Sequence, residues 1–232
     1  MNGQNVVPKH ISFTPNGNRR HARMKHISLE KSYINGALRA LEVAGWAQEV
    51  GIQHVTLFGL SCENLEKRSD SELDALQEGA CEFFDLANDS GIKMHPFGKI
   101  EEFADKPKYA RLYERLAKLR DQTIGPDDFV IHIAANYSGN PHHELGAFMD
   151  QLYARGFAEV RMNPMQYLLS AGVPLVDLAV RTGGEHRTSG LLPFQMAYAE
   201  LYFTPVMWAE FERVHFDTAL AWYREQPRNF GK

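Results

Sequence analysis

Short apolar runs alternate along this chain with longer stretches of helical period, and this alternation constrains the fold more than any other feature. The clearest run is residues 129–135, FVIHIAA, which is almost wholly apolar and bounded by turn residues, as in a fully buried strand. Five further strands are predicted at residues 10–14, 54–60, 92–98, 176–180 and 201–204. Such alternation predicts an α/β fold with a mainly parallel central sheet of about six strands, surrounded by helices.

Helical stretches separate these strands. Residues 30–50 place apolar side chains on one helical face and end at Gly51, and Ser69 to Glu72 forms a capping-box pattern before a second helix. Further helices are predicted at residues 107–122, 141–155, 162–171 and 211–225. Pro96 makes the strand at 92–98 a weaker prediction, because proline cannot donate a hydrogen bond within a central strand.

Length and composition limit the function classes. The 232 residues suit one domain spanning residues 1–232, and a hydrophobic content of 44% argues against disorder. A formal charge of −4 gives no reason to expect nucleic acid, so any anion site must be built locally. No stretch reaches the ~20 apolar residues of a membrane span, and no secretion signal is recognisable. Cys62 and Cys81 are isolated thiols, so we expect a cytoplasmic protein.

One candidate anion site is the turn Asn16-Gly17-Asn18-Arg19-Arg20, directly after the first strand. Glycine permits a tight turn, the N–H groups of a following helix can face an anion, and the arginines add charged donors. Ligands of parallel α/β folds usually bind at the carboxyl ends of strands, where this turn lies. The same residues are also compatible with a plain surface turn followed by a basic helix start.

A second candidate is the segment from Arg181 to Ser189, RTGGEHRTS, again after a strand. Its arginines, double glycine and hydroxyl group could converge on one diphosphate, since the guanidinium fork binds phosphate oxygens in pairs. Further on, Glu200 stands among aromatic residues, where a buried carboxylate needs a cation, a partner or a raised pKa. A salt-bridged glutamate beside a structural arginine explains the same pattern.

Four segments together resemble the cis-prenyltransferases, the undecaprenyl diphosphate synthase group. They are HISFTPNGNRRHAR at 10–23, LFGLSCENL at 57–65, IHIAANYSG at 131–139 and VDLAVRTGGEHRTSGLLPFQMAYAELYFTPVMW at 176–208, in the family's order. The resemblance covers nearly the whole chain. It implies a hydrophobic tunnel, walled by the helices at about 30–50 and 70–88, and a homodimer that binds small prenyl diphosphates.

The resemblance also implies roles for single residues. The first turn would hold an allylic diphosphate through Gly17, Asn18, Arg19 and Arg20, with Asn64 nearby. A second diphosphate would be gripped by Arg181, Arg187 and Ser189, and Glu200 would help to hold Mg²⁺. The residues expected to take part in catalysis are therefore Asn16, Arg20, Asn64 and Glu200.

The chain departs from the family pattern around the first turn. Asn16 stands where the family carries Asp, and a neutral amide oxygen is a poorer Mg²⁺ ligand than a carboxylate. The other departures are Arg19 for Gly, His21 for Trp, Leu29 for Arg, Tyr33 for His, Leu65 for Trp and Asn140 for Arg. The segment expected to bind the second diphosphate is intact. This favours an enzyme with altered chemistry over a degenerating pseudoenzyme.

The favoured interpretation is a head-to-middle condensation of dimethylallyl diphosphate with geranyl or dimethylallyl diphosphate, which gives a branched, lavandulyl-type diphosphate. Arg19 and Arg20 would take over part of the electrostatic role of Mg²⁺, which would then be weakly required or dispensable. Two alternatives stay open. One is ordinary cis elongation with isopentenyl diphosphate, and the other is a non-catalytic partner subunit, although partner subunits usually lose the RTGGE-type motif.

Overall fold

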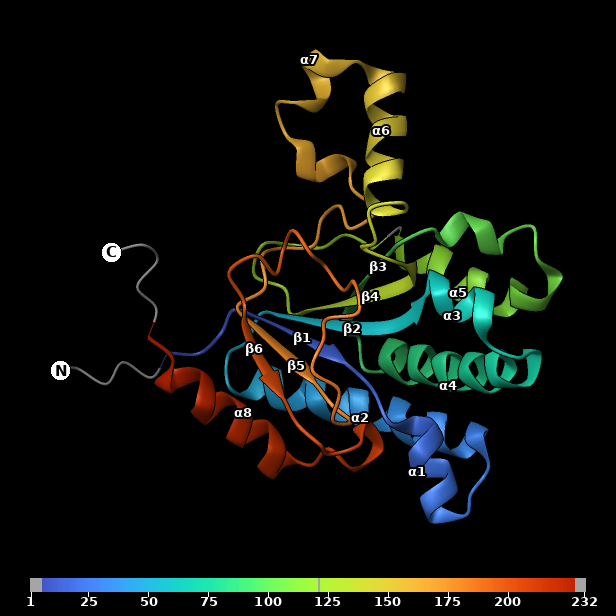
Figure 1. Cartoon of the computed structure of the whole chain (residues 1–232), viewed down its shortest axis with the longest axis vertical. Helices are drawn as coiled ribbons and strands as arrows, with labels where there is room; N and C mark the ends of the chain where they lie inside the picture. The colour runs from blue at the N-terminus through green and yellow to red at the C-terminus, as the bar shows by residue number, and fades with distance from the viewer. Residues whose placement is uncertain (1–5, 121, 228–232) are drawn as a thin grey trace.

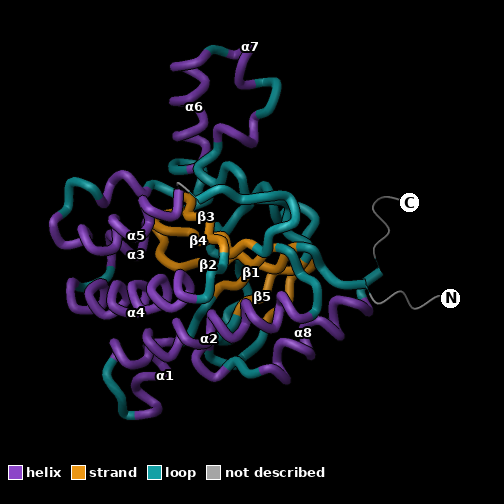
Figure 2. The backbone as a smooth tube through the Cα atoms, turned by 180° about the vertical axis from the view of Figure 1, so that it is seen from behind, coloured by secondary structure: helices purple, strands orange, loops and turns teal. Residues whose placement is uncertain are grey.

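The computed structural model describes residues 6–120 and 122–227, and its centre is one sheet of six parallel strands. The strand order is β3-β4-β2-β1-β5-β6, and every neighbouring pair is parallel (Figures 1 and 2). The strands are β1 (His10–Thr14), β2 (His54–Ser61), β3 (Lys93–Phe97), β4 (Val130–Tyr137), β5 (Leu178–Arg181) and β6 (Glu200–Phe203). The predicted parallel α/β architecture is confirmed.

Helices cover the sheet largely where the sequence predicts them. The α-helices of the described residues are α1 (Asn18–Lys25), α2 (Leu29–Glu49), α3 (Cys62–Lys67), α4 (Asp70–Asp89), α5 (Ala110–Arg120), α6 (Glu144–Arg155), α7 (Phe157–Val160) and α8 (Arg213–Glu225). The predicted helix at 162–171 is wrong: only a short 3-10 helix, η3 (Pro164–Tyr167), forms there. The reason is Pro164, which keeps the preceding Asn163 out of helical geometry.

Pro96 is accommodated because β3 is an edge strand. β3 pairs only with β4, so no second neighbouring strand needs a hydrogen bond from the N–H that Pro96 lacks. The sequence pattern alone does not reveal which strand lies at the edge.

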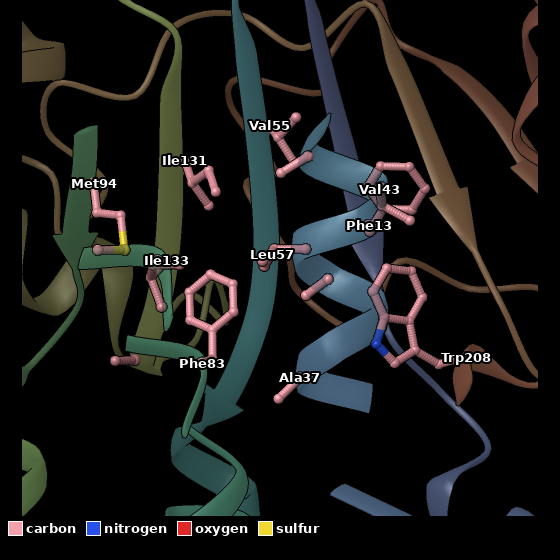
Figure 3. Packing of buried hydrophobic residues seen from close by; sticks show 14 of the residues in the cluster. Phe13, Ala37, Val43, Val55, Leu57, Phe83, Met94, Ile131, Ile133 and Trp208 are labelled. Atoms are coloured by element: carbon pink, nitrogen blue, oxygen red, sulfur yellow. The ribbon is translucent and has the colours of Figure 1, made fainter. Parts of the chain in front are cut away.

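One face of the sheet carries the main hydrophobic core. Phe13, Leu57 and Ile133 point from β1, β2 and β4 toward α2 and α4, where Phe83 and Trp208 complete the packing (Figure 3). All five side chains are at most 6% exposed. At about 1.5–3 kcal/mol for each large buried apolar side chain, this layer fixes α2 and α4 against the sheet.

The opposite face of the sheet is covered by the largely irregular segment 163–199. Val173 and Leu192 from this segment pack on Phe97 and Ala134 of the sheet in a second, smaller cluster.

Four histidines lie side by side on this second face. His10 Nε2 lies 2.7 Å from the hydroxyl oxygen of Thr56. The two ring nitrogens of His132 face His95 Nδ1 at 3.1 Å and His54 Nδ1 at 3.2 Å. Neutral rings satisfy all these contacts, because each ring can donate one hydrogen bond and accept another.

Two further features bear on function. Figures 1 and 2 show α6 and α7 projecting from the body of the molecule, away from α1 and α2. Among the described residues, no helix combines the length and the apolar character that crossing a membrane requires.

Candidate active site

A large cavity opens at the carboxyl ends of β1, β2, β4 and β5. Its volume is about 1780 Å³, and its mouth is polar. Seven cationic side chains and three carboxylates of the described residues line it: Arg19, Arg20, Arg23, Lys67, Arg68, Arg181 and Arg187, with Glu63, Glu72 and Glu185. The mouth is therefore positively charged although the chain carries −4 overall, which is the local construction an anion site requires here.

The interior of the same cavity is apolar. It runs between the sheet and the helices α2, α4 and α5, and its lining includes Ala37, Ala40, Leu57, Leu76, Phe83, Phe84, Leu112, Leu116 and Ile133. A cationic mouth that leads into an aliphatic and aromatic interior suits a ligand with an anionic head and a hydrocarbon chain. Each buried CH₂ of such a chain contributes ~0.8 kcal/mol.

The first turn depends on Gly17. Its backbone has φ of 100°, and a Cβ added there would lie 2.8 Å from Cγ of Met207. The N–H of His21 donates to the carbonyl oxygen of Gly17 at 2.8 Å, so α1 starts immediately after the turn. The N-terminus of α1 therefore faces the cavity mouth, the arrangement in which backbone N–H groups can meet an anion.

Asn16 is held in place at the carboxyl end of β1 by hydrogen bonds to three other residues. Its N–H donates to the hydroxyl of Thr182 at 2.8 Å, and its carbonyl oxygen accepts from the N–H of Trp208 at 2.9 Å. Its side-chain amide Nδ2 donates to the carboxylate of Glu185. The first turn and the loop after β5 are thus joined at Asn16.

The two neighbouring arginines differ in how firmly they are placed. Arg20 donates to the carbonyl oxygen of Gly183 and, at 3.2 Å, to Glu185. Arg19 lies 3.4 Å from Glu72, and its side chain is 62% exposed. Arg20 is therefore built into the site, whereas Arg19 remains free to turn toward a ligand.

The second predicted anion site is assembled around Arg181, which is only 6% exposed. Its guanidinium donates to Ser189 Oγ at 2.7 Å and to the carbonyl oxygen of Arg187 at 2.8 Å. Its Nε is buried without a hydrogen-bond partner. Burial, with the nearby Arg187 cation, holds the pKa of Arg181 below its ordinary value. Glu185, whose carboxylate lies 3.7 Å from Arg181, offsets part of this effect, and a bound anion would add further negative charge.

The remaining predicted site residues divide into two groups. Asn18 and Asn64 line the cavity, and the buried Oδ1 of Asn18 has no hydrogen-bond partner. Glu200 does not line it: it starts β6 opposite Leu178, about 10 Å along the strand direction from the strand end beside Arg181. Since β6 runs parallel to β1, Glu200 lies at the amino end of the strands, whereas Asn16 follows the carboxyl end of β1. Within one chain, the geometry does not support the prediction that Glu200 holds a metal there.

Most of the departures from the family pattern also meet at this cavity. Five of the seven substituted positions line it: Asn16, Arg19, Leu29, Tyr33 and Asn140. The hydroxyl of Tyr33 accepts a hydrogen bond from Arg68 at 2.7 Å, and burial raises the pKa of Tyr33 although Arg68 and Arg19 lower it. His21 instead lies buried, with Nδ1 2.8 Å from the hydroxyl oxygen of Ser32.

Sequence reasoning gave no role to Glu185 or Arg68. Glu185 stood inside the quoted RTGGEHR segment, but only the fold shows that the double-glycine loop turns its carboxylate back to Asn16 and Arg20. His186, in the same segment, stacks on Phe203 with ring centroids 5.0 Å apart.

A parallel α/β fold with two arginine-bearing loops at the mouth of an apolar cavity has the features that suit a diphosphate with a hydrocarbon tail. Residues 14–231 match the protein family described as "Putative undecaprenyl diphosphate synthase". The chain therefore belongs to the cis-prenyltransferase family of undecaprenyl diphosphate synthases, and it is a cis-prenyl diphosphate synthase by family.

Individual relatives agree with this assignment. The chain is 32% identical to the (2E,6E)-farnesyl-diphosphate-specific ditrans,polycis-undecaprenyl-diphosphate synthase of Vibrio cholerae, over 98% of this chain and 92% of that protein. It is also 32% identical to an isoprenyl transferase of Thermus thermophilus, over 97% of this chain and 89% of that protein. Lavandulyl diphosphate synthase from Lavandula x intermedia, solved with dimethylallyl diphosphate, has a TM-score of 0.79 at 22% identity, covering 99% of this chain and 100% of that one. At this identity the last similarity shows the shared fold.

Proposed function

We propose that this chain condenses two allylic diphosphates head-to-middle, joining dimethylallyl diphosphate to dimethylallyl or geranyl diphosphate to give a branched, lavandulyl-type diphosphate. The observation that carries the proposal is where the departures from the family pattern lie. They gather around the first turn and its facing walls, while Arg181, Arg187 and Ser189 keep the second diphosphate site. The solved lavandulyl diphosphate synthase with the same fold is consistent with this proposal.

In this scheme the first substrate lies over Gly17, Asn18, Arg19 and Arg20, with its hydrocarbon chain in the apolar interior. Its C1–O bond breaks and the electron pair leaves with the diphosphate, whose developing charge the arginines stabilise. The alkene of the second substrate then forms the new C–C bond. The resulting cation loses a proton to the released diphosphate, which restores neutrality at carbon.

The cavity walls would select between this outcome and chain elongation. Leu29 and Tyr33 border the space in which the second alkene must turn toward the cation. The orientation of that alkene decides which of its carbons attacks. Asn64 would help to hold the first diphosphate near this point.

Ordinary cis elongation with isopentenyl diphosphate is the second candidate function. It is favoured by relatives at about 32% identity, which are undecaprenyl diphosphate synthases and isoprenyl transferases. The two functions require the same second diphosphate site, so they differ only in which alkene it presents.

Product analysis separates these candidates. The purified protein would receive dimethylallyl diphosphate alone, with geranyl diphosphate, or with isopentenyl diphosphate, each with Mg²⁺ or EDTA. After dephosphorylation, we expect mass spectrometry to identify a branched alcohol in the lanes without isopentenyl diphosphate. A linear product that requires isopentenyl diphosphate would establish elongation instead, and no product in any lane would contradict both functions.

The EDTA lanes address the metal. The family is generally Mg²⁺-dependent, but we propose that Arg19 and Arg20 carry part of that role here. Turnover in EDTA at a tenth or more of the Mg²⁺ rate is expected, because losing a factor of ten corresponds to only about 1.4 kcal/mol of transition-state stabilisation. Abolished turnover that Mg²⁺ restores would refute the arginine role while leaving the product assignment untouched.

We further propose that two copies of the chain associate through the projecting element. Met149 and Tyr153 on α6, Phe157 on α7 and Met162 just after α7 are exposed apolar side chains, and Tyr153 is 95% exposed. Apolar patches of this kind usually mark interaction sites. Light scattering should give about twice the chain mass of 26.4 kDa, and Tyr153→Asp should shift the population toward monomer. A wild-type monomer at micromolar concentration would contradict the dimer.

A further inference from the structure

One carboxylate lies between the two anion-binding loops. Glu185 accepts a hydrogen bond from Asn16 Nδ2 and one from Arg20 at 3.2 Å, and its Oε2 lies 3.7 Å from Arg181. Arg20 belongs to the first turn and Arg181 to the second site. Glu185 therefore contacts both sites at once, and its side chain is only 30% exposed.

The loop that carries Glu185 is fixed by its backbone. Gly183 and Gly184 both have φ of 83°. Their N–H groups donate to the carbonyl oxygens of Val206 at 2.8 Å and Thr204 at 2.9 Å. A Cβ on Gly183 would lie 2.9 Å from the guanidinium of Arg20, so the loop can approach the first turn this closely only with glycine. The position of Glu185 beside Asn16 follows from this close packing.

The amide at position 16 suits this neighbour in a way that a carboxylate does not. Only the NH₂ end of an Asn side chain can donate to a carboxylate, so the contact fixes the orientation of the Asn16 amide. An Asp at the same place would set two carboxylates in contact. Two carboxylates in contact either share a proton, so that only one of them is ionised, or need a cation between them.

A divalent cation does not fit this position in the present chain. Mg²⁺ in substrate-phosphate sites is usually bound by one or two carboxylates. Glu185 already lies 3.2 Å from the Arg20 guanidinium and 3.7 Å from that of Arg181, and these two charges repel a divalent cation. Glu200, the other carboxylate expected to hold Mg²⁺, does not line the cavity. Across residues 6–120 and 122–227, no three His, Cys, Asp or Glu side chains converge in a way that could hold a metal ion.

We propose that the hydrogen bond from Asn16 to Glu185 takes the place of a divalent cation between the first turn and the loop of residues 182–190. Asn16 and Glu185 are then positioning residues, which hold Arg20 and Arg181 in place for the two diphosphates. The importance of this contact for catalysis rests on the proposed function. The presence of the contact does not depend on the proposed function, because thermal unfolding and metal binding test it without turnover.

The test compares wild type with Asn16→Asp by thermal unfolding in EDTA and in millimolar MgCl₂, with NaCl matched for ionic strength. We expect wild type to melt at the same temperature in both. Asn16→Asp should melt about 5 °C lower in EDTA, and Mg²⁺ should restore the loss. The double variant Asn16→Asp with Glu185→Gln should lose this Mg²⁺ response, because it no longer places two carboxylates in contact.

Electron paramagnetic resonance of Mn²⁺ provides an independent readout. Asn16→Asp should deplete the free Mn²⁺ signal, whereas wild type and the double variant should not. Asn64→Asp is the matched control, since it adds the same charge to the same cavity at a residue that is not among the hydrogen-bond partners of Glu185. A Mg²⁺-dependent melting temperature in wild type, or an Asn16→Asp variant as stable in EDTA as wild type, would overturn the proposal. A failure of branched product formation would leave these results unchanged.

Discussion

Replacing Arg181 by Ala is expected to weaken binding of the second diphosphate by about 100-fold, near 3 kcal/mol. Arg181 is buried, and its Nε has no hydrogen-bond partner. Its guanidinium also donates to Ser189 Oγ and to the carbonyl oxygen of Arg187, so it holds the loop of residues 182–190 in place. A charged hydrogen bond contributes ~1.5–3 kcal/mol, and a guanidinium can make two to one diphosphate. The affinity can be measured by calorimetry with an unreactive thiolodiphosphate analogue of dimethylallyl diphosphate.

Two variants control this experiment. Arg181→Lys keeps the charge but loses the planar fork, so we expect an affinity between those of wild type and Arg181→Ala. Arg213→Ala removes a partly exposed arginine that pairs with Glu49 and Asp217 and does not line the cavity, and binding should not change. Unchanged affinity in Arg181→Ala, with an unchanged melting temperature, would remove Arg181 from the site.

We expect the free energy of unfolding to fall as the pH drops below about 6.5, well above the pH range in which carboxylates ordinarily titrate. Burial, followed by the nearby His54, lowers the pKa of His10 from 6.5 to about 3. Burial also lowers the pKa values of His54 and His95, and burial together with the other three rings lowers that of His132. The folded chain therefore binds fewer protons than the unfolded chain below about pH 6.5. The free energy of unfolding must fall as the pH falls, and His10 alone accounts for roughly 4 kcal/mol by pH 3.

The slope of stability against pH tests the histidine cluster. Urea unfolding between pH 8 and pH 4 should give a slope that His132→Asn reduces by about 1.4 kcal/mol per pH unit at its acidic end, the value for one proton. A constant loss of packing in this variant shifts the curve without changing its slope. Exposed His142→Asn is the matched control and should keep the wild-type slope. A profile that stays flat from pH 7 to pH 5 would contradict the neutral, buried cluster.

Much of the fold follows from local signals. The apolar run at 129–135 predicts β4, and the capping box at Ser69 predicts the start of α4. Both signals act within a few residues. The helix predicted at 162–171 failed for the same kind of reason: its apolar residues suggested a helix, but Pro164 prevented it.

The candidate site shows the limit of this reasoning. The residue types of the two loops indicate anion binding, and the structure places Arg181, Arg187 and Ser189 together at one cavity. The strand predicted at 201–204 already begins beside Glu200, but only its parallel pairing with β5 shows that Glu200 lies at the opposite end of the strands from Asn16.

By itself, the sequence determined the parallel sheet, the two arginine-bearing loops and the membership of a family, since each depends on residues close together in the chain. The tertiary structure alone decided that Glu185 meets Asn16 across 169 positions of sequence, and that four histidines on four strands share one partly buried cluster. Such contacts are fixed by the order of the strands in the sheet and by where each loop turns back toward it. A local pattern specifies that a strand or loop forms, but the packing of the whole sheet specifies which one becomes its neighbour.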